Sequence, residues 1–318
     1  MRISTQNVAG MRREFSRGNG PKTALLRNLI GWNTDFLILT EVKANFDHVR
    51  TKKLHKQLEP SMHSLHENAR RGVIIFSNKK HKLIEGSQRE ATRPGHIAAA
   101  VYEVNHSRII VVGFYGEPAS NDRSSAEILR ELKHVLEELQ HVYHTSTVII
   151  AGDFNVTLHH RDSNSPNHTS KPHSAHTLHT LMDDFQLTDL ALTSKKPFHT
   201  WYRPGIQGHS SRLDLILTNI PIQNPTFNLT FTFLDHAFVD ATFNSVRLQK
   251  SPAMKDFILG SDEYLIRSQE LIEKHIQQFG MAQEEEDDGD TNTDIQQLEP
   301  SSLPVDHNKK FEKISILF

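Results

Sequence analysis

The amino-acid sequence predicts an α+β protein, a four-layer αββα sandwich in which two mixed β-sheets pack face to face beneath outer helices. Two observations predict this class. Short strand-like segments recur throughout residues 1–246, and few helical patterns lie between them. Strands and helices also alternate irregularly, without an internal repeat of fixed length, which favours two packed sheets with helices on their outer faces.

The predicted strands are short runs of apolar and β-branched residues, bounded by turn-forming residues. One of them, residues 147–155, contains the apolar run Val148–Ile150, which is typical of a strand buried in a core. The full set spans residues 2–8, 35–40, 72–77, 81–86, 96–104, 108–116, 147–155, 199–203, 211–219 and 236–243.

Helices are predicted where apolar residues recur at helical spacing. Residues 121–144 give the clearest pattern, with Glu and Lys opposite an apolar face. That face consists of Ala126, Leu129, Leu132, Val135, Leu136 and Leu139. Residues 21–32 begin with Pro21, which suits the first turn of a helix, and residues 174–185 form a weaker third pattern.

Charge and composition change along the chain. Residues 1–80 carry 15 Lys and Arg against 6 Asp and Glu, whereas residues 250–318 carry 7 against 15. We therefore predict an enzyme domain over 1–246, an accessory helical segment over 250–280 and an acidic, disordered tail over 281–318. The basic N-terminal part suits contact with phosphates, although a solvated surface explains the same charges.

Composition also excludes several classes of protein. The chain has no cysteine, so disulfides, thiolate catalysis and cysteine-based zinc sites are excluded. No apolar run approaches the roughly 18 residues that would span a bilayer. The first residues lack the apolar core of a signal peptide, so we expect an intracellular protein without a membrane partner.

The segment Gly152–Asn155 follows the apolar run directly, and Gly152 is expected to end the strand. On an extended chain Asp153 and Asn155 point to the same side. Two short polar groups at the end of a buried strand suit a functional site. A simple turn is the alternative, since Gly, Asp and Asn are common in turns.

Similar polar residues follow other predicted strands, and together they form a candidate site. Converging carboxylates without thiols favour a hard cation, Mg²⁺ or Mn²⁺. A histidine beside a carboxylate suits proton transfer or charge stabilisation, and the combination matches metal-assisted phosphodiester hydrolysis. The residues are Asn7, Glu41, Tyr115, Asp153, Asn155, Asp214, Asp235 and His236.

The order of these motifs resembles the endonuclease/exonuclease/phosphatase superfamily, with its DNase I-like fold. The motifs are N-V-x-G at 7–10, L-T-E at 39–41, G-F-Y-G-E-P at 113–118, G-D-F-N at 152–155, S-R-L-D-L-I-L at 211–217 and D-H at 235–236. Within it, the chain is most similar to the apurinic-type endonuclease domain of LINE-type (non-LTR) retrotransposons. That likeness depends on Asp162, on the Phe198–Thr200–Trp201 segment and on Ser211 ahead of Arg212.

The resemblance implies a role for each group. Glu41 would be the main metal carboxylate, with Asn7 and Asp235 as ligands or just outside the ligand shell. Asp153 would position or deprotonate the attacking water. The remaining catalytic roles fall to Asn155, which orients the water, to His236 and Tyr115, which bind the phosphate, and to Asp214, which holds His236. Substrate contacts would come from Asn7, Arg12, Trp201, Ser211 and Arg212.

Several simpler interpretations stay open. Tyr115 and Trp201 suit core packing, and Asp214 suits a strand ion pair with Arg212. Leu234 stands where the family usually has Ser or Thr, and Ala9 stands where many members carry a polar or basic residue.

Three functions remain possible at this point. The resemblance favours a Mg²⁺-dependent DNA endonuclease, expected to be monomeric and nuclear, that leaves 3′-OH and 5′-phosphate ends. A phosphatase of small or lipid phosphoesters, or a decayed and inactive nucleic-acid-binding copy, are the alternatives.

Overall fold

The structure is a computed structural model of the 318-residue chain. It divides into two units, Met1–Arg247 and Leu248–Phe318, and the described residues all belong to the first. These are residues 1–11, 21–30, 33–44, 58–118, 121–164, 171–193, 198–203, 205 and 208–245. Arg12, the predicted helical segment 250–280 and the predicted acidic tail 281–318 lie outside the described residues and stay predictions.

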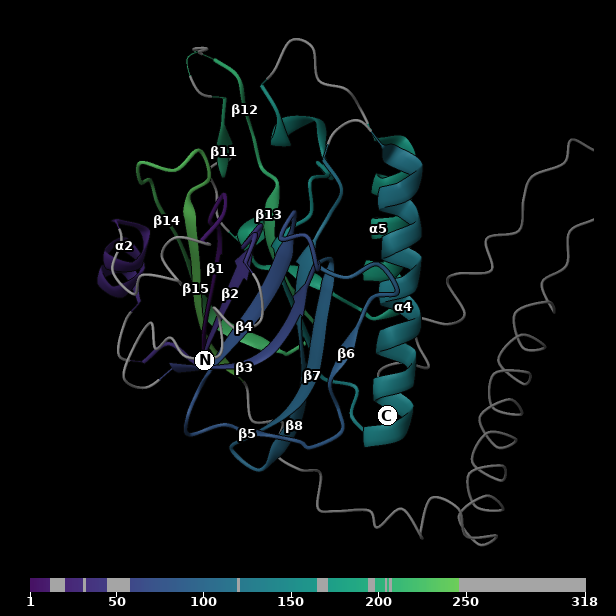
Figure 1. Cartoon of the computed structure of the whole chain (residues 1–318). Coiled ribbons are helices and arrows are strands. Elements are labelled where there is room, and N and C mark those ends of the chain that lie inside the picture. The colour runs from purple at the N-terminus through teal and green to yellow at the C-terminus, as the bar shows by residue number, and fades with distance from the viewer. Residues whose placement is uncertain are drawn as a thin grey trace, which may run out of the picture. The chain divides into compact units, whose positions relative to one another are not determined.

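The first sheet has six strands in the order β14-β15-β1-β2-β4-β3 (Figure 1). Its strands are β1 (Arg2–Asn7), β2 (Phe36–Thr40), β3 (Leu58–Leu65), β4 (Gly72–Asn78), β14 (Ile222–Thr230) and β15 (Phe238–Ser245). β1 and β2 run parallel, and the other neighbours are antiparallel. The sheet is therefore mixed.

The second sheet has the order β10-β13-β9-β8-β7-β5, with β6 paired to β7 as well. Its strands are β5 (Lys82–Leu83), β6 (Arg89–Glu90), β7 (Ile97–Val104), β8 (Ser107–Tyr115), β9 (Val148–Asp153), β10 (Thr188–Asp189) and β13 (Asp214–Thr218). β8 and β9 are parallel, so this sheet is mixed too. A small two-stranded ribbon joins β11 (Trp201–Tyr202) to β12 (Ser210–Ser211).

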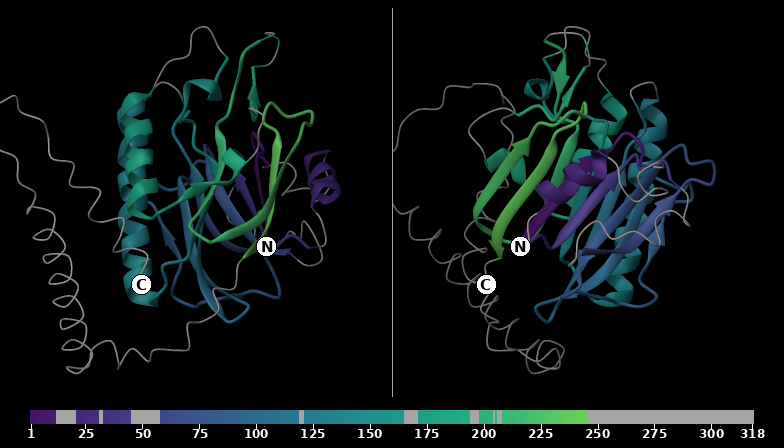
Figure 2. Two further views of the ribbon diagram at one scale, coloured as in Figure 1. Left: turned by 180° about the vertical axis from the view of Figure 1, so that it is seen from behind. Right: turned by 60° about the vertical axis from the view of Figure 1, so that its left-hand side comes forward.

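Helices cover the outer faces of the two sheets. α2 (Pro21–Leu29) lies against the first sheet, while α4 (Asp122–Tyr143) and α5 (Pro172–Asp184) lie side by side on the second (Figures 1 and 2). Two short 3₁₀ turns, η1 (His160–Asp162) and η2 (Leu190–Thr193), complete the described elements. The predicted α+β sandwich is confirmed. Among the described helices, none combines the length and apolarity required to cross a membrane.

Three apolar clusters hold these layers together. One fills the space between α4, α5 and the second sheet, one lies between the two sheets, and one lies under α2. The predicted apolar face of residues 121–144 is buried in the first of them. The helix is capped as its sequence suggests, because the side chain of Asn121 accepts a hydrogen bond from the backbone N–H of Ser124, a favourable N-cap interaction.

The sequence analysis missed β3 and β14, the two edge strands of the first sheet. Both contain a proline, Pro60 and Pro225, and both pair with a register shift beside it. Proline lacks a backbone N–H, so within sheets it is confined to edges and bulges. The sequence signal for a strand is consequently weak there. The strand predicted over 81–86 is also shorter than expected, reduced to β5.

Gly152 has a different role from the predicted one, because β9 continues through it to Asp153. Its φ is +149°, and a Cβ atom at this position would lie 2.0 Å from the carbonyl oxygen of Phe114. Only glycine allows the two parallel strands β8 and β9 to approach this closely. The residue therefore brings Asp153 beside the end of β8.

Candidate active site

The strand ends of both sheets meet at a cleft of about 520 Å³. Most of the predicted site residues line it: Asn7, Glu41, Tyr115, Asp153, Asn155, Trp201, Ser211, Asp235 and His236. Asp214 is fully buried behind His236. The convergence predicted from sequence is thus present in the structure for every described member of the set except Arg212.

Strand register brings these groups together. Asn7 pairs with Thr40 at the ends of parallel strands β1 and β2, so Glu41 follows directly beside Asn7. In the second sheet Asp153 pairs with Tyr115 on one side and with Asp214 on the other. The two sheets each deliver a polar row, and packing the sheets face to face places the rows opposite each other.

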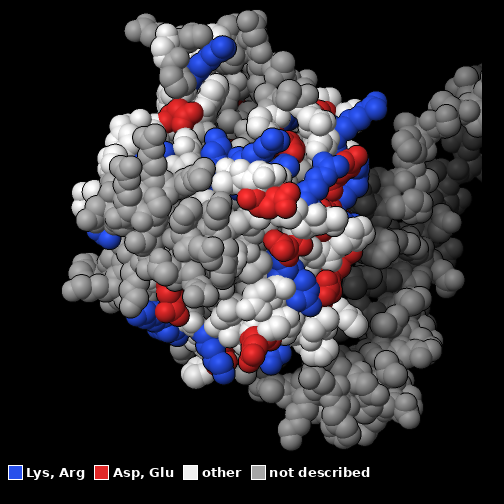
Figure 3. All heavy atoms as spheres, viewed as in Figure 1, with Lys and Arg blue, Asp and Glu red and all other residues white. Residues whose placement is uncertain are grey.

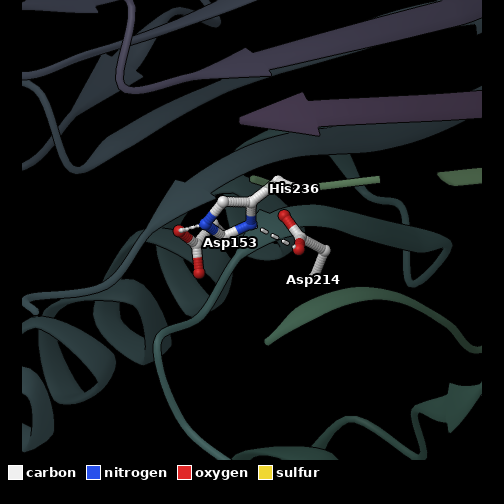
Figure 4. A group of neighbouring side chains, drawn as sticks. All are labelled: Asp153, Asp214 and His236. Atoms are coloured by element: carbon white, nitrogen blue, oxygen red, sulfur yellow. Dashed lines mark hydrogen bonds and ion pairs between the residues drawn. The ribbon is translucent and has the colours of Figure 1, made fainter. Parts of the chain in front are cut away.

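His236 lies between Asp153 and Asp214 (Figure 4). Its Nδ1 donates to Oδ2 of Asp214 at 2.8 Å, and its Nε2 lies 3.8 Å from Oδ2 of Asp153. The first distance is a hydrogen bond and the second is too long for one. Asp214 therefore fixes the imidazole ring, and the Nε2–H is left directed toward the cleft side, near Asp153.

Burial and neighbouring charges shift the pKa values of both His236 and Asp153. Burial lowers the pKa of His236, but the charges of Asp214 and Asp153 outweigh burial and raise the pKa to about 10. Burial raises the pKa of Asp153 to about 7, partly offset by His236. His236 is therefore a cationic donor at neutral pH, while Asp153 can gain or lose a proton there.

These three residues also satisfy a purely geometric criterion for a metal site, since their ligand atoms lie within 4.8 Å of one another. Protonated His236 cannot ligate a metal, because both its nitrogens carry hydrogen. The cluster is therefore better described as a hydrogen-bonded acid–base group. A cation would bind to the carboxylates at the other side of Asp153.

Glu41 and Asn7 form that other side. The Nδ2 of Asn7 donates to Glu41 at 3.0 Å and to Asp153 at 2.9 Å, whereas its Oδ1 accepts the N–H of Ala9. Asn7 therefore orients the two carboxylates, and its predicted place as a metal ligand or just outside the ligand shell stays a prediction. The second oxygen of Glu41 contacts the ammonium of Lys43, so this oxygen already attracts a cation.

The backbone around this group is strained. Ala9, Glu41 and Asn155 all have positive φ, at +45°, +53° and +51°. Non-glycine residues in this region are uncommon and concentrate at functional sites. Two of these residues, Glu41 and Asn155, line the cleft, and Ala9 donates to the side chain of Asn7, so the fold holds this group in place at an energetic cost.

The Gly152–Asn155 segment is both a turn and part of the site. The backbone N–H of Asn155 donates to Oδ1 of Asp153 at 2.9 Å, and its Nδ2 donates to the carbonyl of Gly116 at 3.0 Å. The expectation of an extended chain here is wrong, because Asn155 is left-handed. Asp153 and Asn155 nevertheless end side by side, since an Asx-type turn folds one back onto the other.

Tyr115 lines the cleft and is supported from below by His96. The two rings stack at 6.0 Å, and Nδ1 of the fully buried His96 donates to the backbone carbonyl of Tyr115 at 2.6 Å. Burial and the charges of Glu41 and Asp153 raise the pKa of Tyr115. The phenol therefore stays protonated and can donate to an anion. No sequence pattern indicated His96.

Arg212 does not line the cleft, and its predicted substrate contact is corrected. The residue is 2% exposed. Its Nε and Nη2 donate to the carboxylate of Asp162 at 2.9 and 3.0 Å, and its Nη1 contacts Asp189. Asp162, on which the likeness to retrotransposon endonucleases partly depends, holds Arg212 and the 3₁₀ turn.

Thr200 and Trp201 connect this buried ion pair to the cleft. The Oγ1 of buried Thr200 accepts the N–H groups of Leu213 and Asp214, both at 3.0 Å. Trp201 pairs with His236 through a backbone bridge. The Phe198–Trp201 segment thus positions the strand that carries Asp214. Ser211 lines the cleft and hydrogen-bonds Ser163.

Sequence analysis missed three exposed aromatic residues and one lysine that lines the cleft. Tyr202, Phe231 and Phe233 expose 43%, 57% and 62% of their surface, and the rings of Tyr202 and Phe231 lie 5.2 Å apart. The backbone N–H of Tyr202 donates to the carbonyl of Asp235. The backbone of Tyr202 therefore adjoins Asp235, while the three exposed rings are not part of the cleft lining. Lys171, which also lines the cleft, had no sequence signal beyond its charge.

Position 234 is a leucine and has no hydroxyl, but the turn before Asp235 receives one from Thr232. The backbone N–H of Leu234 donates to Oγ1 of Thr232 at 3.1 Å, the arrangement of an ST-turn. Thr232 thus provides a local side-chain hydrogen bond to the turn that precedes Asp235.

Only part of the basic charge of the N-terminal part lies in the described residues. Figure 3 shows Lys and Arg interspersed with Asp and Glu on the viewed face. Much of the positive charge of residues 1–80 lies outside the described residues, at Arg12, Arg13, Arg17, Arg50, Lys52, Lys53 and Lys56. The predicted phosphate contact of this region therefore stays a prediction.

Known structures share this fold. The 3′ phosphatase NExo from Neisseria, in a structure bound to a product DNA hairpin, matches with TM-score 0.55 and 19% identity, covering 77% of this chain and 99% of that chain. An AP endonuclease from Archaeoglobus fulgidus matches with TM-score 0.56 and 17% identity over 77% and 99% of the two chains. The catalytic domain of Xenopus laevis APE2 matches with TM-score 0.58 and 16% identity over 76% and 91%.

Two packed mixed sheets with a polar cleft at their strand ends define a sandwich of the DNase I-like class. The model of the Endonuclease/Exonuclease/phosphatase family matches residues 4–249, so the chain belongs to this family. Comparison with curated protein sequences gives no match.

Proposed function

We propose that this protein is a Mg²⁺-dependent DNA endonuclease of retrotransposon type, which nicks one strand and leaves 3′-OH and 5′-phosphate ends. The observation that carries the proposal is the pairing of Asp153 with His236. A carboxylate whose pKa is about 7 lies 3.8 Å from an imidazolium whose pKa is about 10. One group accepts a proton and the other stabilises negative charge, as phosphodiester hydrolysis requires.

Each side chain then has a task. Asp153 accepts a proton from the attacking water, and Asn155 fixes the orientation of Asp153. The Nε2–H of His236 donates to a non-bridging phosphate oxygen, while Asp214 keeps the imidazole charged. The protonated Tyr115 donates to another oxygen of the phosphate. Donors that are already in place stabilise the developing charge without reorganisation.

Glu41 and Asp235 would hold Mg²⁺, with Mn²⁺ as a possible substitute. The residues fit, because both carboxylates line the same cleft and Glu41 already attracts the ammonium of Lys43. Oxygen donors in this number suit Mg²⁺, which keeps several waters. When bound, the ion supplies neutralisation of phosphate charge. Asn7 holds Glu41 in position for it.

DNA as the substrate is supported by the exposed aromatic rings of Tyr202, Phe231 and Phe233, which lie outside the cleft lining and suit stacking against bases. The neighbouring structures of a 3′ phosphatase bound to a product DNA hairpin, of an AP endonuclease and of an APE2 catalytic domain also support it, at identities below 20%. The retrotransposon subtype rests on the Phe198–Trp201 segment, Asp162 and the Ser211–Arg212 pair. A nuclear monomer is the form proposed to act on genomic DNA.

A plasmid-nicking assay tests the proposal. The wild-type protein is expected to convert supercoiled plasmid to nicked circles with Mg²⁺ and not with EDTA. Asp153→Asn should reduce the rate by about 10³-fold, within the range of general acid–base contributions. Asp184→Asn is the matched control, because it removes an exposed carboxylate paired with Lys133. Equal rates in wild type and Asp153→Asn would refute the proposed mechanism.

The second assay addresses the subtype and the product ends. Retrotransposon-type activity should cut undamaged DNA as well as DNA with abasic sites, and a DNA polymerase should extend the nick directly. Cleavage restricted to abasic DNA would refute the subtype and leave the nuclease proposal standing.

A phosphatase is the second candidate function, since one neighbouring structure is described as a 3′ phosphatase and the same residues would serve a phosphomonoester. Release of phosphate from soluble phosphoesters, without plasmid nicking, would favour it. A folded protein inactive in both assays would instead indicate a decayed copy.

A further inference from the structure

Lys171 is a buried cation at the cleft that no role so far explains. It is 6% exposed and lines the cleft together with Asn155 and Thr157. Lysine is almost never buried this far unless its charge is paired. Its position therefore calls for an explanation beyond ordinary surface solvation.

The backbone of Lys171 is fixed by two helices. Lys171 is the N-cap residue of α5, and Pro172 occupies the first turn. The carboxylate of Asp122, the first residue of α4, accepts the N–H groups of His173 at 3.0 Å and Ser174 at 2.8 Å. The start of α5 is thus tied to the start of α4, and Lys171 cannot move without disturbing both.

The ammonium group is fixed as well, but only in part. Nζ donates to the backbone carbonyl of Glu117 at 2.7 Å, and Ser125 donates to the same oxygen. An ammonium carries three N–H donors. Within the described residues, Nζ of Lys171 donates one hydrogen bond, to the Glu117 carbonyl. Its other N–H groups can therefore face the cleft.

The cleft beside Lys171 has room for an anion. Burial lowers the pKa of Lys171, and the charges of Asp153, Asp122 and Glu117 offset this lowering only in part. The cleft, at about 520 Å³, falls in the range of drug-sized ligands and has room for more than one phosphate group. Lys171 enters it from the α4–α5 side, whereas His236 enters it from the start of β15.

We propose that Lys171 forms a second phosphate subsite, which binds a non-bridging oxygen of a phosphate adjacent to the scissile one in a polynucleotide. This inference rests on the proposed function, because it assigns His236 and Tyr115 to the scissile phosphate. It predicts that the enzyme recognises a chain of phosphodiesters. A substrate with a single phosphate would leave Lys171 without its anion.

The test combines side-chain and substrate changes. Lys171→Met removes the charge at similar length, Lys171→Arg keeps it, and Lys133→Met removes an exposed lysine paired with Asp184 as the control. Oligonucleotide duplexes carry one neutral methylphosphonate at successive positions around the mapped nick. Lys171→Met should raise KM about 10-fold on the all-phosphate duplex, the size of a charged hydrogen bond, with Lys171→Arg and Lys133→Met near wild type.

Non-additivity identifies the contact. At one position next to the nick, the methylphosphonate should weaken wild type about 10-fold and leave Lys171→Met unchanged, since the same contact is lost only once. Additive losses at every position would overturn the proposal, as would a Lys171→Met defect in kcat alone. Inorganic phosphate should inhibit wild type and Lys171→Met equally. Stronger inhibition of wild type would point to a free-phosphate site and overturn the polynucleotide assignment.

Binding in EDTA separates this inference from the proposed function. Fluorescence anisotropy with the same duplexes should show a salt dependence for Lys171→Met that is lower by about one phosphate contact. If wild type binds but does not nick, the proposed function fails while the subsite is still measured. If wild type nicks and the salt dependence of Lys171→Met is unchanged, the subsite fails alone.

Discussion

Two buried cations in this protein each lie between two aspartates, and only one of them belongs to the cleft. Arg212 lies between Asp162 and Asp189, and His236 lies between Asp153 and Asp214. Both groups are almost completely excluded from solvent. They are also neighbours in sequence, because Arg212 and Asp214 are two residues apart on the same segment.

The two cations differ in how many of their side-chain nitrogens contact a carboxylate. Each of the three side-chain nitrogens of Arg212 contacts a carboxylate. His236 donates to Asp214 at 2.8 Å but keeps Nε2 at 3.8 Å from Asp153. Among the described atoms, Oδ1 of Asp214 also has no hydrogen-bond partner. A fully satisfied ion group stabilises a fold, whereas a partly satisfied one retains a donor for substrate.

Proton chemistry makes the same distinction. Arginine stays charged under all relevant conditions, whereas histidine can release its proton. Removing a partner from Arg212 leaves a buried charge that cannot be neutralised. Removing a partner from His236 leaves a group that can become neutral. The first change should therefore affect stability most, and the second should affect activity most.

Asp214→Asn removes the carboxylate charge beside His236 and should have the largest effect on activity. Asparagine fits the space but no longer holds His236 as a cation, so nicking should fall between about 10²- and 10⁴-fold. The measurement is the initial rate of plasmid nicking, normalised to folded protein. Asp162→Asn is the matched control, and its rate per folded molecule should equal that of wild type. A rate loss of similar size in both variants would abolish the distinction between the two groups.

Arg212→Met tests the structural group directly. It leaves the buried carboxylates of Asp162 and Asp189 without their cation, which should lower the free energy of unfolding by about 3–5 kcal/mol. Urea unfolding monitored by circular dichroism measures this change. The remaining folded molecules should still nick plasmid. A variant as stable as wild type would show that Arg212 does not hold the fold together.

Thr200→Val should affect both stability and activity, because Thr200 holds the segment that carries Arg212 and Asp214. Its Oγ1 accepts two buried backbone N–H groups, and valine would leave both without a partner. We expect a stability loss of about 2–4 kcal/mol together with a roughly tenfold loss of nicking as Asp214 shifts. Thr200→Ser, which keeps the hydroxyl, should restore both properties. If Thr200→Ser resembles Thr200→Val, the hydroxyl is not the cause.

The sequence predicted much of this site because its residues stand at strand ends. Asp153, Glu41 and Tyr115 each stand at the end of a continuous apolar run, and the change from apolar to polar residues locates such ends well. Their convergence could be predicted because strand ends of two packed sheets gather at one edge. The edge strands β3 and β14 could not be predicted, since Pro60 and Pro225 disrupt the pattern of a strand.

The remaining site residues lack a local signal. Arg212 was predicted to contact substrate because of the motif around it. The local sequence does not distinguish a buried arginine from an exposed one. Its partner Asp189 lies 23 residues away, in a two-residue strand without strong periodicity. Lys171 and His96 likewise acquire their positions only from tertiary contacts. Burial of a charged residue depends on distant partners and is therefore not readable from a short window.

A buried carboxylate outside the cleft lining, that of Asp35 immediately before β2, gives the last and smallest prediction. Asp35 accepts from His81 at 2.7 Å, from Lys80 at 2.7 Å and from the backbone N–H of Arg2 at 2.7 Å. Burial raises the pKa of Asp35, but these partners outweigh burial and lower it to about 2, from an ordinary value of 3.8. Like the carboxylates around Arg212, the carboxylate of Asp35 is bound by several donors, so we expect it to stabilise the fold.

Asp35→Asn should therefore lower the free energy of unfolding by about 2 kcal/mol at neutral pH and leave nicking unchanged. The carboxylate has a lower pKa in the folded state, so its stabilisation is present above pH about 4. It should disappear as the pH falls toward 2, where the folded state also binds the proton. Urea unfolding of wild type and Asp35→Asn at successive pH values measures the difference, which should shrink only below pH about 4. A difference that grows on acidification would show the opposite shift, and a loss of nicking would place this aspartate–histidine pair with Asp214 and His236 instead of with Arg212.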